Sequence, residues 1–299
     1  MAEVLRVAHP VVARRSRRWL VRELQHSTSA VVGLVILSLI VISALFAPQL
    51  APYDPLKQNI RIRLLPPSWM EGGRMEYLLG TDNLGRDILS RIIYGARVAV
   101  SVPLAAVSFA VLIGVTLGLL AGYFRGRVDE VIMRITDVQL AIPFILIVIA
   151  VIALFGTSLT NLIIVLGITG WLYYARLVRS EVLAMREREY VTAARALGMS
   201  NFRIMLRHVL PGVIPTIIVL ATVDVARVTL IEAALSFVGL GVQPPTPTWG
   251  GMVSDGRNHI FQAWWFSTFP GVTITLQVLG VNLLGDWLRV VLDPRLRHG

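Results

Sequence analysis

Long apolar segments are the feature that most constrains how this chain can fold. A helix that crosses a bilayer core of about 30 Å needs roughly 20 predominantly apolar residues. Such segments lie at residues 30–47, 98–124, 138–175, 209–240 and 264–288. As a single helix the third would be about 57 Å long, so it holds two spans joined by a turn at residues 156–161. The sequence therefore predicts an all-α polytopic membrane protein with six transmembrane helices.

The charged residues are few, and the arginines are placed asymmetrically. Only 15% of the 299 residues are charged and 55% are hydrophobic, whereas soluble domains carry about 25% charged residues. If the N-terminus is inside, the inner segments are 1–29, 125–137, 176–208 and 289–299. These hold six, three, seven and three arginines, and the short outer loop at 157–161 holds none. The asymmetry follows the positive-inside rule, which predicts a cell-membrane protein with both termini in the cytoplasm and no nucleic-acid partner.

The domain organisation follows from these segments. A cytoplasmic basic segment (1–29) precedes a first transmembrane anchor (30–47), which is longer than the core of a signal peptide and has no clear cleavage site after it. An extracytoplasmic segment (48–97) leads into a core of five spans (98–288), and a cytoplasmic tail (289–299) follows. Three prolines are predicted to bend the spans that contain them, namely Pro103, Pro143 and Pro215.

The cytoplasmic segment at residues 180–211 interrupts the apolar pattern between the fourth and fifth spans. Residues 190–197 favour a helix, and Gly198 favours its end because glycine readily adopts the left-handed conformation. A second helix is predicted from about Asn201 into the fifth span. Two interpretations are open: a docking element whose small residues let a soluble partner approach closely, or a surface amphipathic helix with basic residues.

Several kinds of site are missing from the sequence. A Walker-type nucleotide loop needs a lysine after a glycine-rich turn, and the only lysine, Lys57, has no such context. There is no cysteine, and the five histidines are scattered, so neither a thiolate site nor a metal site is predicted. We therefore expect no cofactor and no catalytic residue, and any ATP that drives this protein has to be bound by another subunit.

Three ionisable residues, Asp224, Arg227 and Glu232, lie within the fifth span. Ionisable groups at membrane depth are costly and normally face a bundle interior or a water-filled path. Asp224 and Arg227 are three residues apart, so they can pair on one face of the helix. Either these groups line or gate a pathway, or they pack against another subunit. The position of Glu232 slightly favours an interface with another subunit near the outer end of the span.

The cytoplasmic segment resembles the EAA loop of permease subunits of ATP-binding-cassette importers, whose pattern is roughly E-A-A-x3-G-x9-I-x-L-P. The chain has Thr-Ala-Ala at 192–194, Gly198 and then Leu-Pro at 210–211, with threonine in place of the glutamate and His208 in place of the isoleucine. The resemblance implies a coupling helix that sits in a cleft on an ATPase subunit. The residues it assigns to this loop are Glu189, Tyr190, Thr192, Ala193, Ala194, Arg195, Leu197 and Gly198.

Two further segments resemble dipeptide, oligopeptide and nickel importers. LLGTDNLGRDILSRIIYGAR at 78–97 resembles the segment before their second span, and EAALSFVGLGVQPPTPTWGGMVSDG at 232–256 resembles the exit from their fifth. The resemblance covers nearly the whole chain and identifies it as a C-type permease subunit with the ABC type I importer fold. It implies four kinds of partner: a B-type permease, two ATP-binding subunits, an extracytoplasmic binding protein and the lipid bilayer.

The resemblance also implies a function for the outer loops. It indicates peptide import by alternating access, with nickel or another small solute as the alternative substrate. Asp82, Arg86 and Asp87 lie around a predicted turn, which is either solvated or a gate or contact for the binding protein. Trp249 belongs to the same outer group, and the proline-rich segment before it is predicted to shape the vestibule rather than to recognise substrate.

Two other classes of function compete with this interpretation. A secondary transporter driven by protons or sodium would use Asp224 or Glu232 as its coupling carboxylate and would favour internal repeats, which the sequence does not display. A membrane-embedded enzyme would need converging acid, base or metal ligands, and the sequence offers none. The first rival predicts transport by this chain alone, without ATP.

Overall fold

The computed structural model describes residues 27–292, and the regular structure in this range is helical, with one isolated bridge between Thr81 and Asp87. The basic N-terminal segment predicted at 1–29 and the tail predicted at 289–299 lie largely outside the described residues. All-α architecture, as the apolar pattern predicts, is therefore confirmed for the part of the chain that the structure describes.

Between residues 27 and 292, five helical segments are long and apolar enough to cross a membrane. They are α2 (Thr28–Leu45), α4 (Ile88–Phe124), α7 (Leu159–Arg186), the continuous segment Asn201–Phe237 and α12 (Trp265–Leu292). The segment Asn201–Phe237 consists of α9 (Asn201–Ile204), a π-helical turn (Met205–Val209) and α10 (Leu210–Phe237). The remaining helices are α3 (Ala47–Leu50), a 3-10 turn (Ile60–Ile62), α5 (Gly126–Ala141), α6 (Phe144–Phe155), α8 (Glu189–Ala196) and α11 (Trp249–Arg257).

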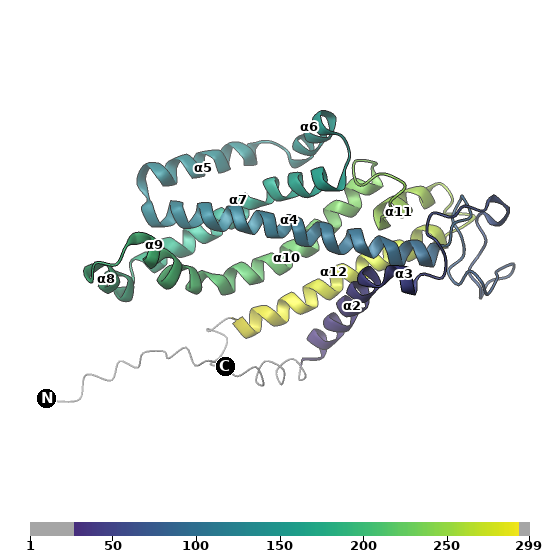
Figure 1. The fold of residues 1–299 in the computed structure, drawn as a ribbon, viewed down its shortest axis with the longest axis horizontal. Coiled ribbons are helices and arrows are strands. Elements are labelled where there is room, and N and C mark those ends of the chain that lie inside the picture. The colour runs from purple at the N-terminus through teal and green to yellow at the C-terminus, as the bar shows by residue number, and fades with distance from the viewer. Residues whose placement is uncertain (1–26, 293–299) are drawn as a thin grey trace.

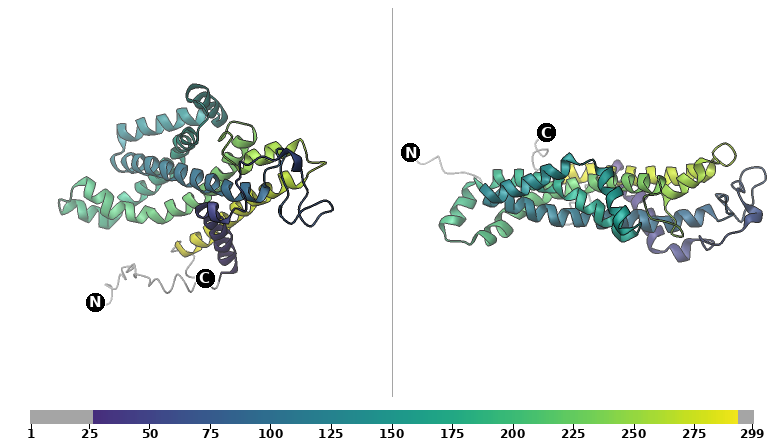
Figure 2. Two further views of the ribbon diagram at one scale, coloured as in Figure 1. Left: turned by 45° about the vertical axis from the view of Figure 1, so that its right-hand side comes forward. Right: turned by 90° about the horizontal axis from the view of Figure 1, so that it is seen from above.

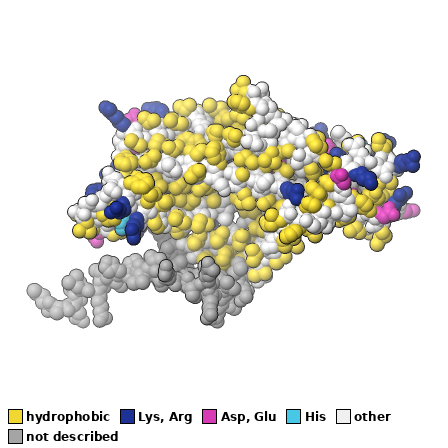
Figure 3. Space-filling view, viewed as in Figure 1, with side chains coloured by type: hydrophobic (Ala, Val, Ile, Leu, Met, Phe, Trp, Pro, Cys, Tyr) yellow, Lys and Arg dark blue, Asp and Glu magenta, His cyan; other side chains and the backbone are white. Residues whose placement is uncertain are grey.

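The long helices run side by side along the longest axis of the molecule, with α4 against α7 and α12 between α10 and α2 (Figures 1 and 2). We call the end that carries α8 and α9 the hairpin end. The opposite end carries residues 46–87 and α11, and we call it the loop end. On the face shown in Figure 3, charged side chains gather mainly at these two ends and hydrophobic side chains cover the middle, as expected of a protein that spans a bilayer.

The third predicted span is the one that departs from a single helix. α5 and α6 are bent by 88° at a break between them. Ile142 has an extended backbone there (φ −91°, ψ 121°), because the following residue, Pro143, disfavours the helical conformation of its predecessor. α6 has 12 residues, about 18 Å, and cannot cross the bilayer core alone. Counted as one broken span, the pair brings the total to the six predicted. Pro103 and Pro215 lie inside α4 and α10, which continue through them.

α4 begins at Ile88, ten residues before the span predicted from Val98. The residue before it, Asp87, caps the helix, since its carboxylate accepts a hydrogen bond from the N–H of Ser90 (2.8 Å). The helix has 37 residues, which makes it about 56 Å long, and it therefore extends beyond the hydrocarbon core. The hydropathy pattern did not predict this extension, because the first turns of α4 contain charged residues.

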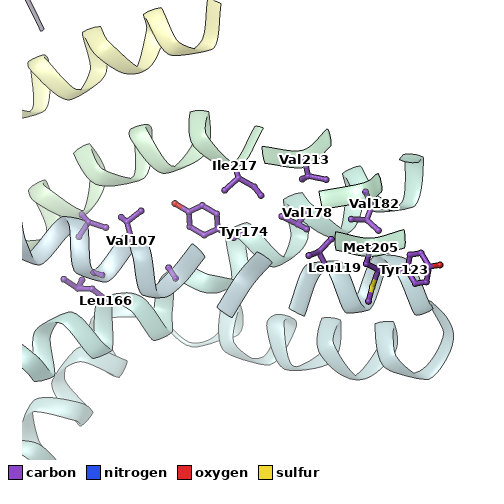
Figure 4. Close-up of a cluster of buried hydrophobic side chains, with 14 of the residues drawn as sticks. Val107, Leu119, Tyr123, Leu166, Tyr174, Val178, Val182, Met205, Val213 and Ile217 are labelled. Atoms are coloured by element: carbon purple, nitrogen blue, oxygen red, sulfur yellow. The ribbon is translucent and has the colours of Figure 1, made fainter. Parts of the chain in front are cut away.

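A row of small residues lets α4 approach α7 closely. An added Cβ would lie 2.3 Å from the carbonyl oxygen of Trp171 at Gly114, and 2.7 Å from that of Ala175 at Gly118. These glycines are four residues apart and lie on the same face of α4, the arrangement that brings membrane helices into backbone contact. Large side chains such as Tyr174 fill the space beside this contact and form, with α10, the main buried cluster (Figure 4).

The replacement Gly118→Ala tests this packing. We expect a loss of about 1–3 kcal/mol in the free energy of unfolding, because the added methyl group overlaps the backbone of α7. Gly271→Ala is the matched control: it is also in a helix, and its added Cβ would meet nothing within 4 Å. Thermal unfolding of the two variants in detergent measures the difference. Equal effects of the two replacements would show that the close α4–α7 contact contributes no stability.

Candidate functional site

The hairpin at residues 189–204 is built from α8 and α9, which are joined by a glycine turn. α8 ends at Ala196, and Gly198 has a φ of 76°, a conformation that favours glycine. The N–H of Gly198 donates a hydrogen bond to the carbonyl oxygen of Arg195 (3.0 Å), which satisfies a free carbonyl group at the helix end. The predicted helix, its glycine end and the second helix from Asn201 are confirmed.

α8 turns one side inward and the other outward. Val191 and Ala194, three residues apart on one helix face, are buried in the main core. The other residues assigned to this loop are exposed: Glu189, Tyr190, Thr192, Ala193, Arg195, Leu197 and Gly198. Leu197 is a large apolar side chain with 83% of its surface exposed. The expectation that Ala194 offers a surface for close approach is wrong, because its side chain packs inside the protein.

The hairpin is attached firmly to the long helices. The hydroxyl group of Tyr123, at the end of α4, donates a hydrogen bond to the side-chain oxygen of Asn201 (2.9 Å). The guanidinium group of Arg186, at the end of α7, lies over the Tyr123 ring at 5.8 Å from its centroid. From Asn201 the chain stays helical through the π-helical turn to Phe237. The hairpin is therefore joined to α10 by one continuous helical segment.

At the loop end, Asp82 is the centre of a buried ion cluster. Its carboxylate accepts hydrogen bonds from the Nε of Arg86 (2.6 Å) and from the guanidinium group of Arg91. Asp255, in α11, lies 3.8 Å from both guanidinium groups. The predicted turn is present, with Gly85 at a φ of 71°, but Asp82, Arg86 and Arg91 are buried. The interpretation of this segment as a solvated turn is wrong: the cluster ties the loop end together.

Asp87 and Trp249 hold the start of α4. The hydroxyl group of Ser90 donates to the carboxylate of Asp87 (2.6 Å), and burial raises the pKa of this carboxyl group above its ordinary value although the bonds from Ser90 lower it. The indole N–H of Trp249 donates to the carbonyl oxygen of Ile92 (2.9 Å). Its ring lies so close to Gly95 that an added Cβ would be 2.7 Å away. Trp249 is buried, so in this structure it stabilises α4 against α11.

The replacement Trp249→Phe tests this anchoring role. It removes the hydrogen bond to Ile92 and leaves part of the ring space empty, so we expect a loss of about 1–3 kcal/mol in the free energy of unfolding. Trp264→Phe is the control, because Trp264 is 40% exposed and forms no side-chain hydrogen bond with the described residues. Thermal unfolding should separate the two variants, and similar losses would contradict the anchoring role.

The charged residues of α10 form a network inside the bundle. The Nε of Arg227 donates to the carboxylate of Asp224 (2.6 Å), as the spacing predicts, and the hydroxyl group of Tyr174 donates to the other carboxylate oxygen (3.0 Å). The guanidinium group lies 4.6 Å from the centroid of the Tyr173 ring. Asp224 is buried, but the side chain of Arg227 is 40% exposed. A guanidinium group exposed at this depth has to face water or protein rather than lipid.

Two further polar groups lie along the same helices. Glu232 is buried, and its carboxylate accepts a hydrogen bond from the hydroxyl group of Ser236 (2.8 Å). The side-chain amide of Gln277, in α12, donates to the carbonyl oxygen of Ala99 (2.7 Å) and lies 3.2 Å from the hydroxyl group of Thr229. Interhelical hydrogen bonds of this kind join α4, α10 and α12 without an ion pair.

Several of these residues were not found from the sequence. Arg91 and Asp255 are separated from Asp82 by 9 and 173 positions, and Tyr173 and Tyr174 lie about 50 positions from their α10 partners. No local pattern reports such pairings, because they depend on how the helices pack. Among the described residues, no group of three or more histidine, cysteine, aspartate or glutamate side chains is placed to hold a metal ion.

Comparison with known protein families identifies the class of this protein. Residues 114–298 match the family of inner membrane components of binding-protein-dependent transport systems. Residues 18–67 match the N-terminal transmembrane domain of oligopeptide transport permease C. The chain therefore belongs to the family of inner membrane components of binding-protein-dependent transport systems, and it is a multi-pass membrane protein.

Named relatives match along nearly the whole chain. The chain is 46% identical over 273 residues to the di/tripeptide transport system permease protein DppC of Pseudomonas aeruginosa, covering 91% of this chain and 90% of that protein. It is 44% identical over 276 residues to a dipeptide transport system permease protein of Alkalihalophilus pseudofirmus (92% and 89%). For the Escherichia coli protein of the same name the identity is 45% over 274 residues (92% and 91%).

The fold is also found in a solved transporter. A chain of the MetNI methionine ABC transporter in an inward facing conformation superposes with a TM-score of 0.57 at 18% identity, covering 68% of this chain and 96% of that chain. At this identity the likeness establishes the fold alone. The predicted permease fold of an ABC importer is confirmed.

Proposed function

We propose that this chain is the C-type permease subunit of an ATP-driven importer that moves peptides into the cytoplasm. The observation that carries the proposal is the 46% identity to a di/tripeptide permease over 91% of the chain. The match extends over 273 residues, so it is not confined to one motif. Small solutes such as nickel are the alternative cargo within the same kind of complex.

The hairpin end faces the cytoplasm in this proposal. The arginine-rich segments at 125–137 and 176–208 both lie at this end, in agreement with the positive-inside rule. The N-terminal segment and the tail are then cytoplasmic as well, and residues 48–97 are extracytoplasmic. The arrangement leaves the apolar tip of the hairpin, with Leu197, exposed to the cytoplasm.

The hairpin couples the membrane helices to ATP-binding subunits. Its exposed face combines small residues such as Ala193 with Tyr190 and Leu197, a surface suited to insertion into a cleft of another protein. Because the helix from Asn201 continues to Phe237, movement of the ATP-binding subunits shifts α10 and opens the path alternately to the two sides.

Arg227 lines this path, or an interface that moves with it. The exposed part of the Arg227 guanidinium group has to contact water or protein rather than lipid. The ion pair with Asp224 and the stacking on Tyr173 keep this group in one position. A homologous B-type permease forms the other half of the path. An extracytoplasmic binding protein delivers the substrate at the loop end, where Asp82, Arg86, Asp87 and Trp249 support the contact surface from within.

Uptake by proteoliposomes tests the proposed function. The complete assembly of this chain, the B-type permease, two ATP-binding subunits and the binding protein should accumulate radiolabelled dialanine only when ATP is present on the side of the ATP-binding subunits. Omitting those subunits should abolish uptake. Uptake by this chain alone that follows a proton or sodium gradient would refute the proposal and favour ion-coupled transport through Asp224 or Glu232.

A further inference from the structure

A cavity of about 640 Å³ opens at the loop end. Its walls come from three parts of the chain that are distant in sequence: residues 48–56, the face of α4 that carries Tyr94 and Arg97, and the proline-rich residues 245–247. The cavity lies apart from the buried Asp82 cluster and from the charged residues of α10. None of the residues of the coupling hairpin lines it.

Two opposite charges line this cavity without pairing with each other. Asp54 uses one carboxylate oxygen to accept a hydrogen bond from the N–H of Leu56 (2.8 Å), and the other has no partner among residues 27–292. Arg97 donates from Nε to the carbonyl oxygen of Ala44 (3.0 Å), and its two terminal nitrogens have no hydrogen-bond partner in the same range. Both side chains are exposed, and no ion pair joins them. The cavity therefore presents an unused anionic group and an unused pair of donors.

The walls are held in place before any ligand binds. The backbone N–H of Tyr53 donates to the hydroxyl group of Ser90 (3.0 Å), which ties the 48–56 segment to the capped start of α4. The Tyr53 ring also stacks on Tyr77, with ring centroids 5.0 Å apart. The guanidinium group of Arg97 lies 5.3 Å from the centroid of the Tyr94 ring. Preorganised charged groups lose little entropy when they bind a ligand.

The cavity lies at the level where the first span ends. Arg97 contacts the carbonyl group of Ala44, and α2 ends one residue later. The apolar side chains that follow, Leu45 and Phe46, are exposed, as is Leu50 in α3. Tyrosines and an arginine at this level are typical of the boundary between hydrocarbon and water. The end of the first span therefore places the cavity close to both the aqueous phase and the lipid headgroups.

We propose that this cavity binds a zwitterion, with Asp54 contacting its ammonium group and Arg97 contacting its carboxylate or phosphate group. Guanidinium groups bind such planar or multidentate anions through paired donors, and carboxylates accept hydrogen bonds from ammonium groups. Two sources supply this chemistry: a short peptide on its way to the path and the headgroup of phosphatidylethanolamine. The peptide source rests on the proposed function, and the lipid source does not.

The test uses the purified assembly without its binding protein in phosphatidylglycerol nanodiscs. One arm measures binding of radiolabelled dialanine by equilibrium dialysis, with N-acetyl-dialanine and dialanine amide as analogues that lack one charge. The other arm adds phosphatidylethanolamine and counts the molecules retained per assembly by native mass spectrometry. Asp54→Asn keeps the hydrogen bond to Leu56 and removes the charge, and Arg97→Gln removes the guanidinium group. Glu71→Gln and Arg63→Gln make the same charge changes at exposed positions outside the cavity.

We expect at least one probe to bind. Each cavity variant should weaken the binding of that probe about tenfold, which is the usual contribution of a hydrogen bond to a charged group. The two control variants should bind like the wild type. If dialanine is the probe that binds, its preference over N-acetyl-dialanine should disappear in Asp54→Asn. Binding of dialanine identifies the peptide source, and retention of phosphatidylethanolamine identifies the lipid source. Binding of neither probe, or equal effects of cavity and control variants, overturns the proposal. ATP-driven uptake by the same assembly with its binding protein shows independently whether the proposed function stands.

Discussion

Replacing Ala193 by glutamate should abolish ATP-driven uptake while the permease still inserts and assembles in the membrane. Ala193 is exposed on α8, so the variant does not disturb the core that Val191 and Ala194 form on the opposite face. In the proposed complex the side chain at this position enters a cleft of the ATP-binding subunit. A carboxylate placed there is desolvated without a partner.

The expected loss of uptake is large because α8 forms only a small contact with the ATP-binding subunit, so that one central position contributes much of the binding. Disruption of a central interface position costs about 2 kcal/mol or more, which corresponds to roughly a 30-fold weaker contact. Initial uptake rates in proteoliposomes give the loss, and the ATPase rate of the same preparation shows whether hydrolysis has become independent of transport. Ala193→Ser is the matched control, because it adds one oxygen atom and no charge, and it should keep most of the uptake. Unchanged uptake by Ala193→Glu would remove α8 from the coupling contact.

Replacing Asp224 by asparagine should destabilise the protein strongly. Asp224 is buried and is the only ion-pair partner of Arg227 among the described residues. Removing one partner of a fully buried pair typically costs about 3–5 kcal/mol, because the remaining charge is left uncompensated. The side chain of Arg227 is 40% exposed and only partly desolvated, so we expect a loss at the lower end of that range. We therefore expect a large decrease in the thermal unfolding temperature of Asp224→Asn in detergent.

The double variant Asp224→Asn/Arg227→Gln separates the charge effect from a loss of packing. It removes both charges, so it should recover most of the lost stability. If the double variant is no more stable than Asp224→Asn alone, the pair is not what stabilises this region. A stable double variant that assembles but transports poorly would place Arg227 on the path, whereas failure to assemble with the B-type permease would place it at the interface between subunits.

Local patterns in the sequence were enough to predict the long helices and the hairpin. Apolar length marks the five unbroken spans, the arginine distribution suggests an orientation, and Gly198 marks the end of α8 because its positive φ favours glycine. The pairing of Asp224 with Arg227 also follows from spacing alone, since residues three apart lie on one helix face. These features are local, and sequence patterns report local structure directly.

Features that depend on packing were not predicted. α11 lies in an outer loop for which the sequence predicted no helix. Its cap is Thr248, whose hydroxyl group accepts a hydrogen bond from the N–H of Gly251 (3.1 Å). The inward orientation of Ala194 was missed because small residues suit both a core and a docking surface. The Asp82 cluster brings together α4 and α11, which no spacing in the sequence relates.

The start of α4 after Asp87 lies between these two cases, because one local pattern predicts it and another does not. An aspartate before an apolar run is a favourable N-cap, so the start of α4 at Ile88 was accessible from capping rules. Hydropathy alone placed the start at Val98, because Arg91 and Arg97 dilute the apolar signal. Both arginines have their partners on other parts of the chain, at Asp82 and at Ala44.

Site-specific crosslinking tests most directly whether the hairpin transmits the action of ATP-binding subunits. The chain has no cysteine, so single cysteines can be introduced without background from this subunit. Ala193→Cys and Leu197→Cys should crosslink to an ATP-binding subunit in the assembled complex and react with maleimide only from the cytoplasmic side. Ala194→Cys, which is buried, should react slowly, and Leu56→Cys at the loop end should not crosslink to that subunit. Labelling of Ala193→Cys from outside the cell, or a crosslink from Leu56→Cys to the ATP-binding subunit, would contradict the account.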